Sequence, residues 1–169
     1  PQASSSTVVL NKGLFSKPLL SLSLVRLLFM FNFNFERGIM PIFLHESESF
    51  RASETQIGIY MGSISFASAL SQLFLGSIAD RIGSRKLMVF GLLAGGLSYV
   101  SLMYLDGVVS LYLLGVLQGI FFAACEVSMM IHMMEIMPSG SSGIVMGFYG
   151  LSEDIGGIIA SPSLGLVYD

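Results

Sequence analysis

Five long apolar stretches restrict what this 169-residue chain can fold into. They cover approximately residues 18–45, 57–79, 87–105, 108–137 and 144–168. A helix needs roughly 20 mainly apolar residues to cross the hydrocarbon core of a bilayer, and each stretch is close to or beyond that length. A membrane barrel would instead show alternating segments of about 10 residues. The stretches therefore predict an all-α integral membrane protein with five transmembrane helices.

The composition supports the same class and excludes others. Hydrophobic residues make up 53% of the chain and charged residues 11%, whereas a soluble domain carries about 25% charged residues. The mean hydropathy is +0.78. The net charge of −3 and the lack of a basic run argue against a nucleic-acid partner. Cys125 is the lone cysteine, so the chain has no internal disulfide framework. The lipid bilayer is the expected surrounding.

The chain divides into a short polar segment and a membrane domain. Residues 1–13 are predicted to be a polar tail or linker, and residues 14–169 the membrane domain. The chain begins with Pro1 and carries no pattern typical of a cleaved signal peptide, which favours a fragment or a processed product.

Basic residues indicate the orientation of the helices. If the N-terminus is cytoplasmic, the outer loops contain one basic residue, Arg51, and the inner side receives Lys12, Lys17, Arg81, Arg85 and Lys86. Lysine and arginine accumulate on the cytoplasmic side of short loops. The loop at residues 80–86 is therefore predicted to be cytoplasmic.

One short polar segment separates the second and third stretches and reads GSIADRIGSRK, residues 76–86. It resembles the turn signature of the major facilitator superfamily, G-x-x-x-D-R-x-G-x-R-R/K. The defining positions are all filled, by Gly76, Asp80, Arg81, Gly83, Arg85 and Lys86. A generic cytoplasmic loop would explain the basic residues but not the spaced glycines or the acidic residue.

The resemblance implies that these six residues form a motif for conformational switching. Gly83 permits a sharp turn, and Gly76 permits the close approach of a neighbouring helix. Asp80 could lie at the positive N-terminal end of an adjacent helix.

Two further patterns resemble the same family less closely. Gln118 and Gly119 match the fourth-helix pattern R-x-x-Q-G, but Gly115 stands where the arginine belongs. The fifth stretch resembles the antiporter pattern G-x-x-x-G-P-x-x-G-G with two glycines replaced, by Ser161 and Leu166, so antiport is not implied.

The resemblance implies five helices of a six-helix half of a transporter. Such a protein moves a small solute across a cell membrane, plasma or inner, by alternating access around a site at mid-membrane. The missing other half is then a necessary partner. The altered fourth-helix pattern and the polar leader favour the second half, while the intact turn signature is commoner in the first; we favour the second.

Several polar and ionisable side chains interrupt the apolar stretches. An isolated charge at the bilayer centre costs at least about 2.5–3.5 kcal/mol on insertion scales, so such groups are expected to pair or to line a wet cavity. They are Arg26, Asn32, Asn34, Glu36 and Arg37 in the first stretch, Glu126 in the fourth, and Glu153 and Asp154 in the fifth. Arg26 lies nearer the inner end and is expected to extend to the interface.

The first and fourth helices line the central cavity in this family. The resemblance therefore implies Arg37 and Glu126 as the leading candidates for contact with solute or a coupling ion, with Asn34 as a neutral hydrogen-bonding partner. A proton, if one is coupled, would be taken by Glu126, Glu153 or Asp154. The alternative is a structural Arg–Glu pair that locks two helices together.

Small residues form a stripe on the second and on the fifth stretch. At 100° per residue, each set falls on one narrow face. The stripes are Gly58, Gly62, Ser65, Ala69, Gln72 and Gly76, and Gly147, Gly150, Asp154, Gly157, Ser161 and Gly165. Such faces allow close helix packing, either within this half or, as the resemblance implies, against the other half.

Two other functions remain open from the residues alone. An intramembrane metal-dependent enzyme could use Glu126, His132 and Glu135, although His132 and Glu135 are better explained as a solvated helix end. A nontransporting membrane scaffold is the other alternative. The transporter interpretation predicts no enzymatic activity, no metal site and no cofactor.

Overall fold

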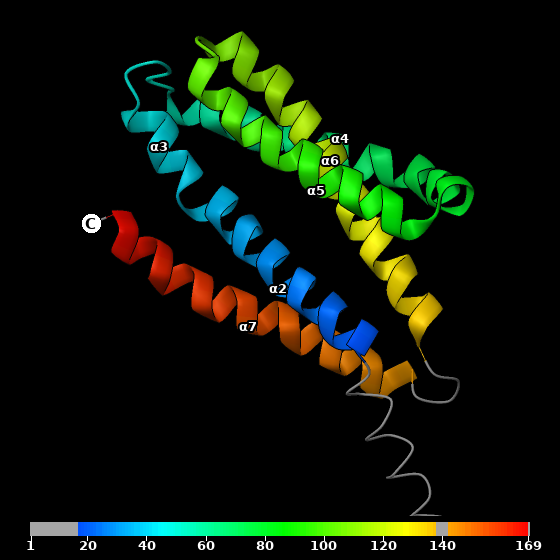
Figure 1. Ribbon diagram of the computed structural model, residues 1–169. Helices are drawn as coiled ribbons and strands as arrows, with labels where there is room; N and C mark the ends of the chain where they lie inside the picture. The colour runs from blue at the N-terminus through cyan, green and yellow to red at the C-terminus, as the bar shows by residue number, and fades with distance from the viewer. Residues whose placement is uncertain (1–16, 138–141, 169) are drawn as a thin grey trace, which may run out of the picture. The chain divides into compact units, whose positions relative to one another are not determined.

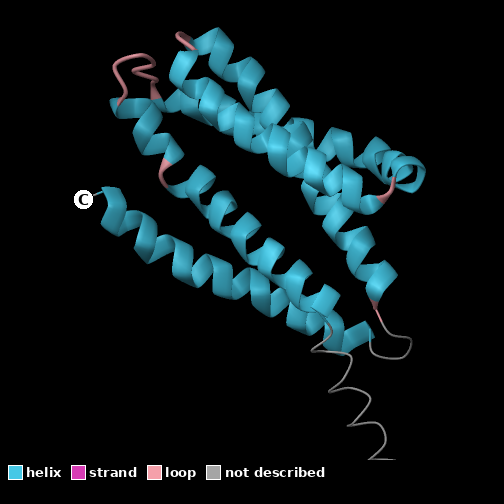
Figure 2. Ribbon diagram, viewed as in Figure 1, coloured by secondary structure: helices cyan, strands magenta, loops and turns pink. Residues whose placement is uncertain are grey.

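The computed structural model describes residues 17–137 and 142–168, and the predicted tail at residues 1–13 lies outside them. Within these ranges every regular element is helical (Figure 2). The elements are α2 (Lys17–Gly38), α3 (Met40–Glu46), α4 (Glu54–Ile82), α5 (Ser84–Ser101), the 3-10 turn η1 (Leu102–Tyr104), α6 (Val108–Ile136) and α7 (Ser142–Tyr168). The five predicted stretches coincide with these helices, which confirms the all-α membrane fold class.

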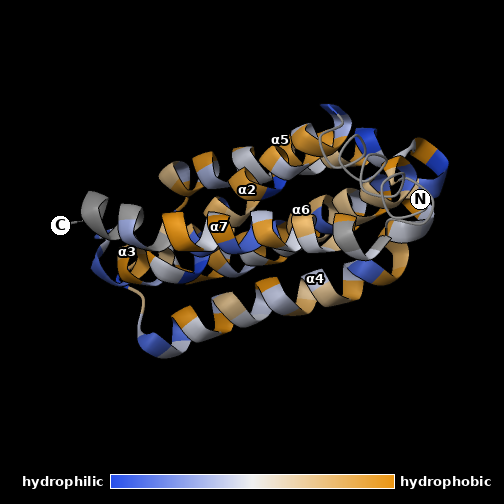
Figure 3. Ribbon diagram, turned by 90° about the horizontal axis from the view of Figure 1, so that it is seen from below, coloured by the Kyte–Doolittle hydropathy of each residue, from blue (hydrophilic) through white to orange (hydrophobic). Residues whose placement is uncertain are grey.

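Four helical segments in the described part of the chain are long and apolar enough to cross a membrane. They are Lys17–Glu46, Glu54–Ile82, Ser84–Tyr104 and Val108–Ile136. The fifth predicted stretch forms the 27-residue helix α7. Apolar residues recur along α4, and most of its hydrophilic residues gather toward its two ends (Figure 3).

Much of the apolar surface is exposed. Phe66 and Leu73 on α4 are 71% and 73% exposed, and Leu97 on α5 is 69% exposed. Soluble monomers rarely expose large contiguous apolar patches. Surroundings of lipid explain these side chains, because lipid tails are as apolar as the residues themselves.

The first stretch is divided, although the sequence predicted one continuous span. Helix α2 ends at Gly38, where the amide of Ile39 still donates to the carbonyl of Phe35 at 3.0 Å, and α3 begins at Met40. Pro41 explains the division. Proline has no N–H to donate, and it disfavours the helical conformation in the residue before it.

Helix α4 has well-defined ends. At its start, the hydroxyl of Ser53 accepts from the amide of Gln56, whose side chain accepts from the amide of Ser53 at 2.8 Å. At its end, Gly83 adopts a φ of +92° and α5 begins at the next residue. Glycine adopts a positive φ readily, which agrees with the sharp turn predicted at Gly83. The connection is shorter than the sequence suggested, because Asp80 and Arg81 still belong to the last turn of α4.

The chain forms two compact units, which we describe separately. The first contains α2 and α7, which lie side by side (Figure 1). Their backbones approach at Gly156, where an added Cβ would lie 2.9 Å from the Cβ of Met30 and 3.0 Å from the carbonyl oxygen of Leu27.

The second unit spans residues 41–132 and brings α4, α5 and most of α6 together. Their shared core consists of Leu75, Ala79, Leu87, Ala123 and Ala124, with Val127 and Ile131 packed against it. Small residues dominate this core, so the helices approach closely, as is common in membranes.

Helices α4 and α6 also meet at two glycines. A Cβ on Gly115 would collide with Ser63 and would lie 2.9 Å from the ring of Tyr60. There is thus no room here for the arginine of the family's fourth-helix pattern. The buried hydroxyl of Tyr60 donates to Gln118 at 2.5 Å. Glycine at position 115, in place of the family's arginine, therefore allows a close contact between α4 and α6 that an arginine would prevent.

Gly119 provides a test of this close packing. A Cβ at Gly119 would collide with the carbonyl oxygen of Ile64 and lie 3.0 Å from the amide nitrogen of Ser68. Backbone atoms cannot move aside cheaply, so Gly119→Ala should destabilise the protein by about 1–3 kcal/mol, as overpacking does. The measurement is the thermal unfolding midpoint of the purified protein in detergent.

Gly96→Ala on α5 is the matched control, because no atom lies within 4 Å of its added Cβ. There the gain in helix propensity of up to about 1 kcal/mol should leave the midpoint unchanged or higher. Equal midpoints for the two variants would show that α4 and α6 do not touch at Gly119.

Candidate functional site

An ion pair joins the two helices of the first unit. Arg26 on α2 places its Nη2 atom 2.7 Å from the Oε2 atom of Glu153 on α7. The side chain of Arg26 is 7% exposed and that of Glu153 is 46% exposed. The contact therefore has a buried cationic side and an accessible acidic side.

Aromatic rings complete the surroundings of Arg26. Its guanidinium carbon lies 5.0 Å from the ring centre of Tyr149 and 5.9 Å from that of Phe29. A guanidinium within about 6 Å of an aromatic face is attracted by the ring electrons. The expectation that Arg26 extends to the interface is therefore wrong, because Arg26 is held inside the unit by a carboxylate and two rings.

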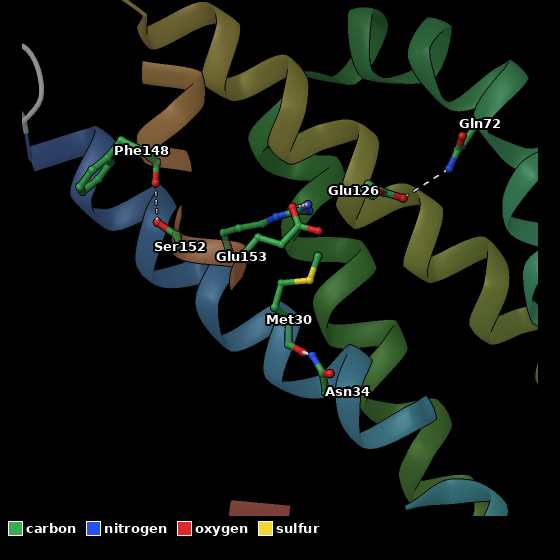
Figure 4. Close-up of polar contacts among 8 residues, drawn as sticks. Met30, Asn34, Gln72, Glu126, Phe148, Ser152 and Glu153 are labelled. Carbon is green, nitrogen blue, oxygen red and sulfur yellow. Dashed lines mark hydrogen bonds and ion pairs between the residues drawn. The ribbon is translucent and has the colours of Figure 1, made fainter. Parts of the chain in front are cut away.

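The other polar residues of α2 use local partners. Asn34 donates from Nδ2 to the carbonyl of Met30 at 2.8 Å, and an added Cβ on Gly157 would lie 3.7 Å from the same nitrogen (Figure 4). Asn34 therefore faces α7. Arg37 is exposed at the last turn of α2, with its guanidinium 4.3 Å from the ring centre of Phe33.

The acidic residues of the first unit differ in accessibility. Glu36 is 7% exposed and is therefore a buried acid close to the end of α2. Asp154, next to Glu153 on α7, is exposed. The hydroxyl of Ser152 donates back to the carbonyl of Phe148 at 3.1 Å and so stays within its own helix (Figure 4). Glu153 is thus the predicted α7 acid that the structure brings into an ion pair.

A second polar contact lies within the other unit. Gln72 on α4 donates from Nε2 to the Oε2 atom of Glu126 on α6 at 3.4 Å (Figure 4). Sequence analysis placed Gln72 only on the small-residue face. The sequence did contain an indication of this pair. Both residues are polar and lie in the middle of apolar spans, where an amide and a carboxyl group are stabilised by bonding to each other.

The turn signature has an unexpected partner on α6. Arg85 donates from Nε to the Nε2 atom of His132 at 3.2 Å, and the hydroxyl of Ser84 lies 3.5 Å from Nδ1 of the same ring. His132 is 7% exposed. The expectation of a solvated helix end is therefore wrong for His132, although Glu135 is exposed.

The remaining residues of the turn signature lie on the surface of the second unit. Asp80, Arg81 and Lys86 are exposed. Nothing lies within 4 Å of a Cβ added to Gly76. The close helix approach predicted for Gly76 is thus not found among the described residues.

The small-residue stripes are largely uncovered. An added Cβ would meet nothing within 4 Å at Gly58 and Gly62 on α4, or at Gly147 and Gly150 on α7. The surroundings of Ser161 and Gly165 lie outside the described part. Close packing of these four glycines within this half is therefore not observed in the described ranges.

Arg37 and Glu126 belong to different units, so their predicted relation to each other stays a prediction. In the part of the chain that the structure describes, no three His, Cys, Asp or Glu side chains gather as metal ligands would. The metal-dependent alternative thus finds no support in the described residues.

These features define a helical integral membrane protein with ionic and polar side chains paired between its long helices. Residues 22–169 match the sequence profile of the Major Facilitator Superfamily, and the chain belongs to this family.

Two curated relatives are similar to the chain. Sugar efflux transporter A of Dickeya chrysanthemi is 28% identical over 128 residues, which cover 76% of this chain and 32% of the relative. An uncharacterised MFS-type transporter of Methanocaldococcus jannaschii is 26% identical over 131 residues, which cover 72% of this chain and 34% of the relative. The chain thus spans about a third of the length of each relative. No solved structure matches it significantly.

The ion pair between Arg26 and Glu153 predicts unequal effects of two neutral substitutions. Glu153→Gln leaves the buried guanidinium without its counterion, whereas Arg26→Gln leaves a carboxyl group that is half exposed. Losing the partner of a buried charge is the costlier change. Glu153→Gln should therefore lower the thermal unfolding midpoint more than Arg26→Gln does.

The double variant measures the coupling between the two residues. Residues in direct contact couple by about 0.5–3 kcal/mol, so the double variant should be more stable than the sum of the single effects. Asp154→Asn, an exposed neighbour on α7, is the control and should leave the midpoint unchanged. Strictly additive effects would mean that Arg26 and Glu153 do not interact.

Proposed function

We propose that this chain is part of one half of a secondary transporter that moves a small solute by alternating access. The observation that carries the proposal is the Arg26–Glu153 pair between the long helices α2 and α7 of a Major Facilitator Superfamily chain. Charges inside spanning helices are expensive and mark solute or ion pathways.

The solute class follows from the groups that the site offers. Glu153 is accessible and can accept hydrogen bonds, whereas its partner Arg26 and the nearby ring of Tyr149 are buried. An accessible carboxylate suits a small polar solute with hydroxyl groups, which can donate hydrogen bonds to it. Sugars are therefore the first solutes to test, and the name of the Dickeya relative supports this choice.

Proton coupling is assigned to Glu126. Its partner Gln72 carries a neutral amide, which has both donors and an acceptor and can therefore bond to a carboxyl group with or without a proton. Protonation of Glu153 would instead break the ion pair with Arg26. Glu126 is thus better suited than Glu153 to gain and lose a proton during transport, with Asp154 as the remaining candidate.

The uncovered glycines of α4 and α7 are proposed to face the missing half of the transporter. Small residues allow two helices to pack closely and to slide. We propose that the turn at residues 80–86 lies on the cytoplasmic side of a cell membrane, and the excess of lysine and arginine there supports this orientation.

A reconstitution assay tests the function. The full-length protein, placed in proteoliposomes, should accumulate or release a radiolabelled sugar when a proton gradient is imposed, and a protonophore should abolish the gradient-driven part. Protein-free liposomes are the control. If a panel of sugars and other small polar solutes crossed no faster than in the control, with either gradient direction, the transporter proposal would be wrong.

Glu126 and Arg37 give a prediction with two different readouts. Glu126→Gln should abolish the dependence of transport on the proton gradient while solute exchange continues, because the glutamine keeps the contact with Gln72 but carries no titratable proton. Arg37→Gln should weaken binding of carboxylate-bearing solutes more than of neutral ones, because Arg37 is an exposed cation. Transport and binding are measured in proteoliposomes.

The structural alternative predicts another result for the same residues. If Arg37 and Glu126 only lock two helices, both single variants should express poorly, and exchange of the two charges should restore expression. Unchanged transport and unchanged pH dependence in both single variants would remove these residues from the site.

Asp80→Asn should impair the conformational cycle more than solute binding. Asp80 lies in the last turn of α4, away from the middle of the spans, and its exposed carboxylate is free to contact a helix outside this unit. The transport rate should fall while the equilibrium dissociation constant of the solute stays the same. A sharp loss of affinity with an unchanged inward–outward equilibrium would contradict this role.

A further inference from the structure

The second unit contains a buried histidine whose ring is bonded at both nitrogens to the residues that start α5. Arg85 approaches Nε2 at 3.2 Å and Ser84 approaches Nδ1 at 3.5 Å. The three residues come from the turn signature and from the last third of α6, 47 and 48 positions apart in the chain. The contact therefore ties the turn after α4 to α6.

The chemistry of the donors determines which ring nitrogen carries the hydrogen. A guanidinium can only donate, so Nε2 of His132 must accept and carry no hydrogen. In the neutral ring the hydrogen then resides on Nδ1, which can donate to the hydroxyl of Ser84. The observed arrangement is thus compatible with neutral His132 only.

Protonation of His132 would remove this arrangement. A second hydrogen on Nε2 would point at the donor of Arg85, and two cations would meet at hydrogen-bonding distance. The charged residues near this contact along the chain are Asp80 and Arg81 on α4, Lys86 on α5 and Glu135, three residues after His132 on α6. Together with Arg85 they comprise three basic and two acidic residues.

We propose that neutral His132 is a positioning residue that holds Arg85 of the turn signature, and that its protonation releases the start of α5 from α6. Imidazole is the side chain whose charge ordinarily changes between about pH 5 and 8. The contact requires the neutral ring, and protonation of the ring removes it.

The consequence for transport rests on the proposed function. The turn signature is the part of the chain assigned to conformational switching, and the excess of basic residues places it on the cytoplasmic side. Acidification of the cytoplasm would then change the balance between inward-open and outward-open states through His132, independently of the proton that Glu126 carries.

Nuclear magnetic resonance of labelled histidine tests the contact itself. The full-length protein in nanodiscs, with the His132 signal assigned by its loss in His132→Gln, should show the Nδ1–H form at about pH 8. Arg85→Gln should shift that signal. An Nε2–H form at about pH 8, or a signal unchanged by Arg85→Gln, would overturn the proposal.

A distance measurement tests the release of α5. Spin labels replace Val89 on α5 and Met130 on α6, which are both exposed, and Cys125 is replaced by serine. Double electron–electron resonance should show a longer or broader distance distribution at about pH 5 than at about pH 8. His132→Gln should abolish this pH dependence, because the glutamine oxygen can still accept from Arg85 and does not titrate.

His45→Gln is the matched control. His45 is the other histidine of the chain and contacts the carbonyl of Ala52 at 3.1 Å, within the segment that joins α3 to α4. This variant should keep the pH dependence of the wild type. The same loss in both variants, or no pH-dependent distance in the wild type, would overturn the proposal.

Transport provides the last readout. The difference in transport rate between cytoplasmic pH of about 8 and about 6 should be smaller in His132→Gln than in His45→Gln. The regulatory role would be overturned if both spectroscopic changes were observed but the two variants showed the same pH dependence of transport. Failure of the transporter proposal would appear differently, as no transport in any variant, while both spectroscopic results would persist.

Discussion

The cost of a charge inside a bilayer is the constraint on which the rest of this structure depends. Arg26 is buried in a spanning helix and is acceptable there because Glu153 and two aromatic rings surround its guanidinium. This requirement sets which faces of α2 and α7 meet. Gly156 then lets the two backbones approach closely enough for the ion pair to form at 2.7 Å.

In the second unit, a different kind of residue determines how the helices pack. Here small residues rather than charges decide how α4, α5 and α6 meet, because lipid tails compete equally for every apolar side chain. Gly119 and Gly115 bring α6 against α4, and a Cβ added to Gly91 on α5 would lie 3.1 Å from backbone atoms of Phe121 and Cys125 on α6. Polar contacts such as Gln72–Glu126 are placed on this framework instead of creating it.

Opposite surfaces of α4 have different surroundings. One side contacts α6 through Tyr60 and Ala67, whereas Gly58 and Gly62 have no neighbour within 4 Å of an added Cβ. A helix that is packed on one side and presents small residues on another is suited to a moving interface. The short turn at Gly83 joins this helix to α5, whose second residue, Arg85, contacts His132 on α6.

The sequence alone determined the class, the apolar helical stretches and the family, because hydrophobic length and the spacing of GSIADRIGSRK are local properties of the chain, but it did not show the division of the first stretch at Gly38. It also indicated which polar residues lie inside the spans. Only the tertiary structure decided their partners. Arg26 meets Glu153 across 127 positions and Arg85 meets His132 across 47. Such pairs depend on helix rotation and on small-residue contacts between helices, and neither composition nor periodicity carries that information.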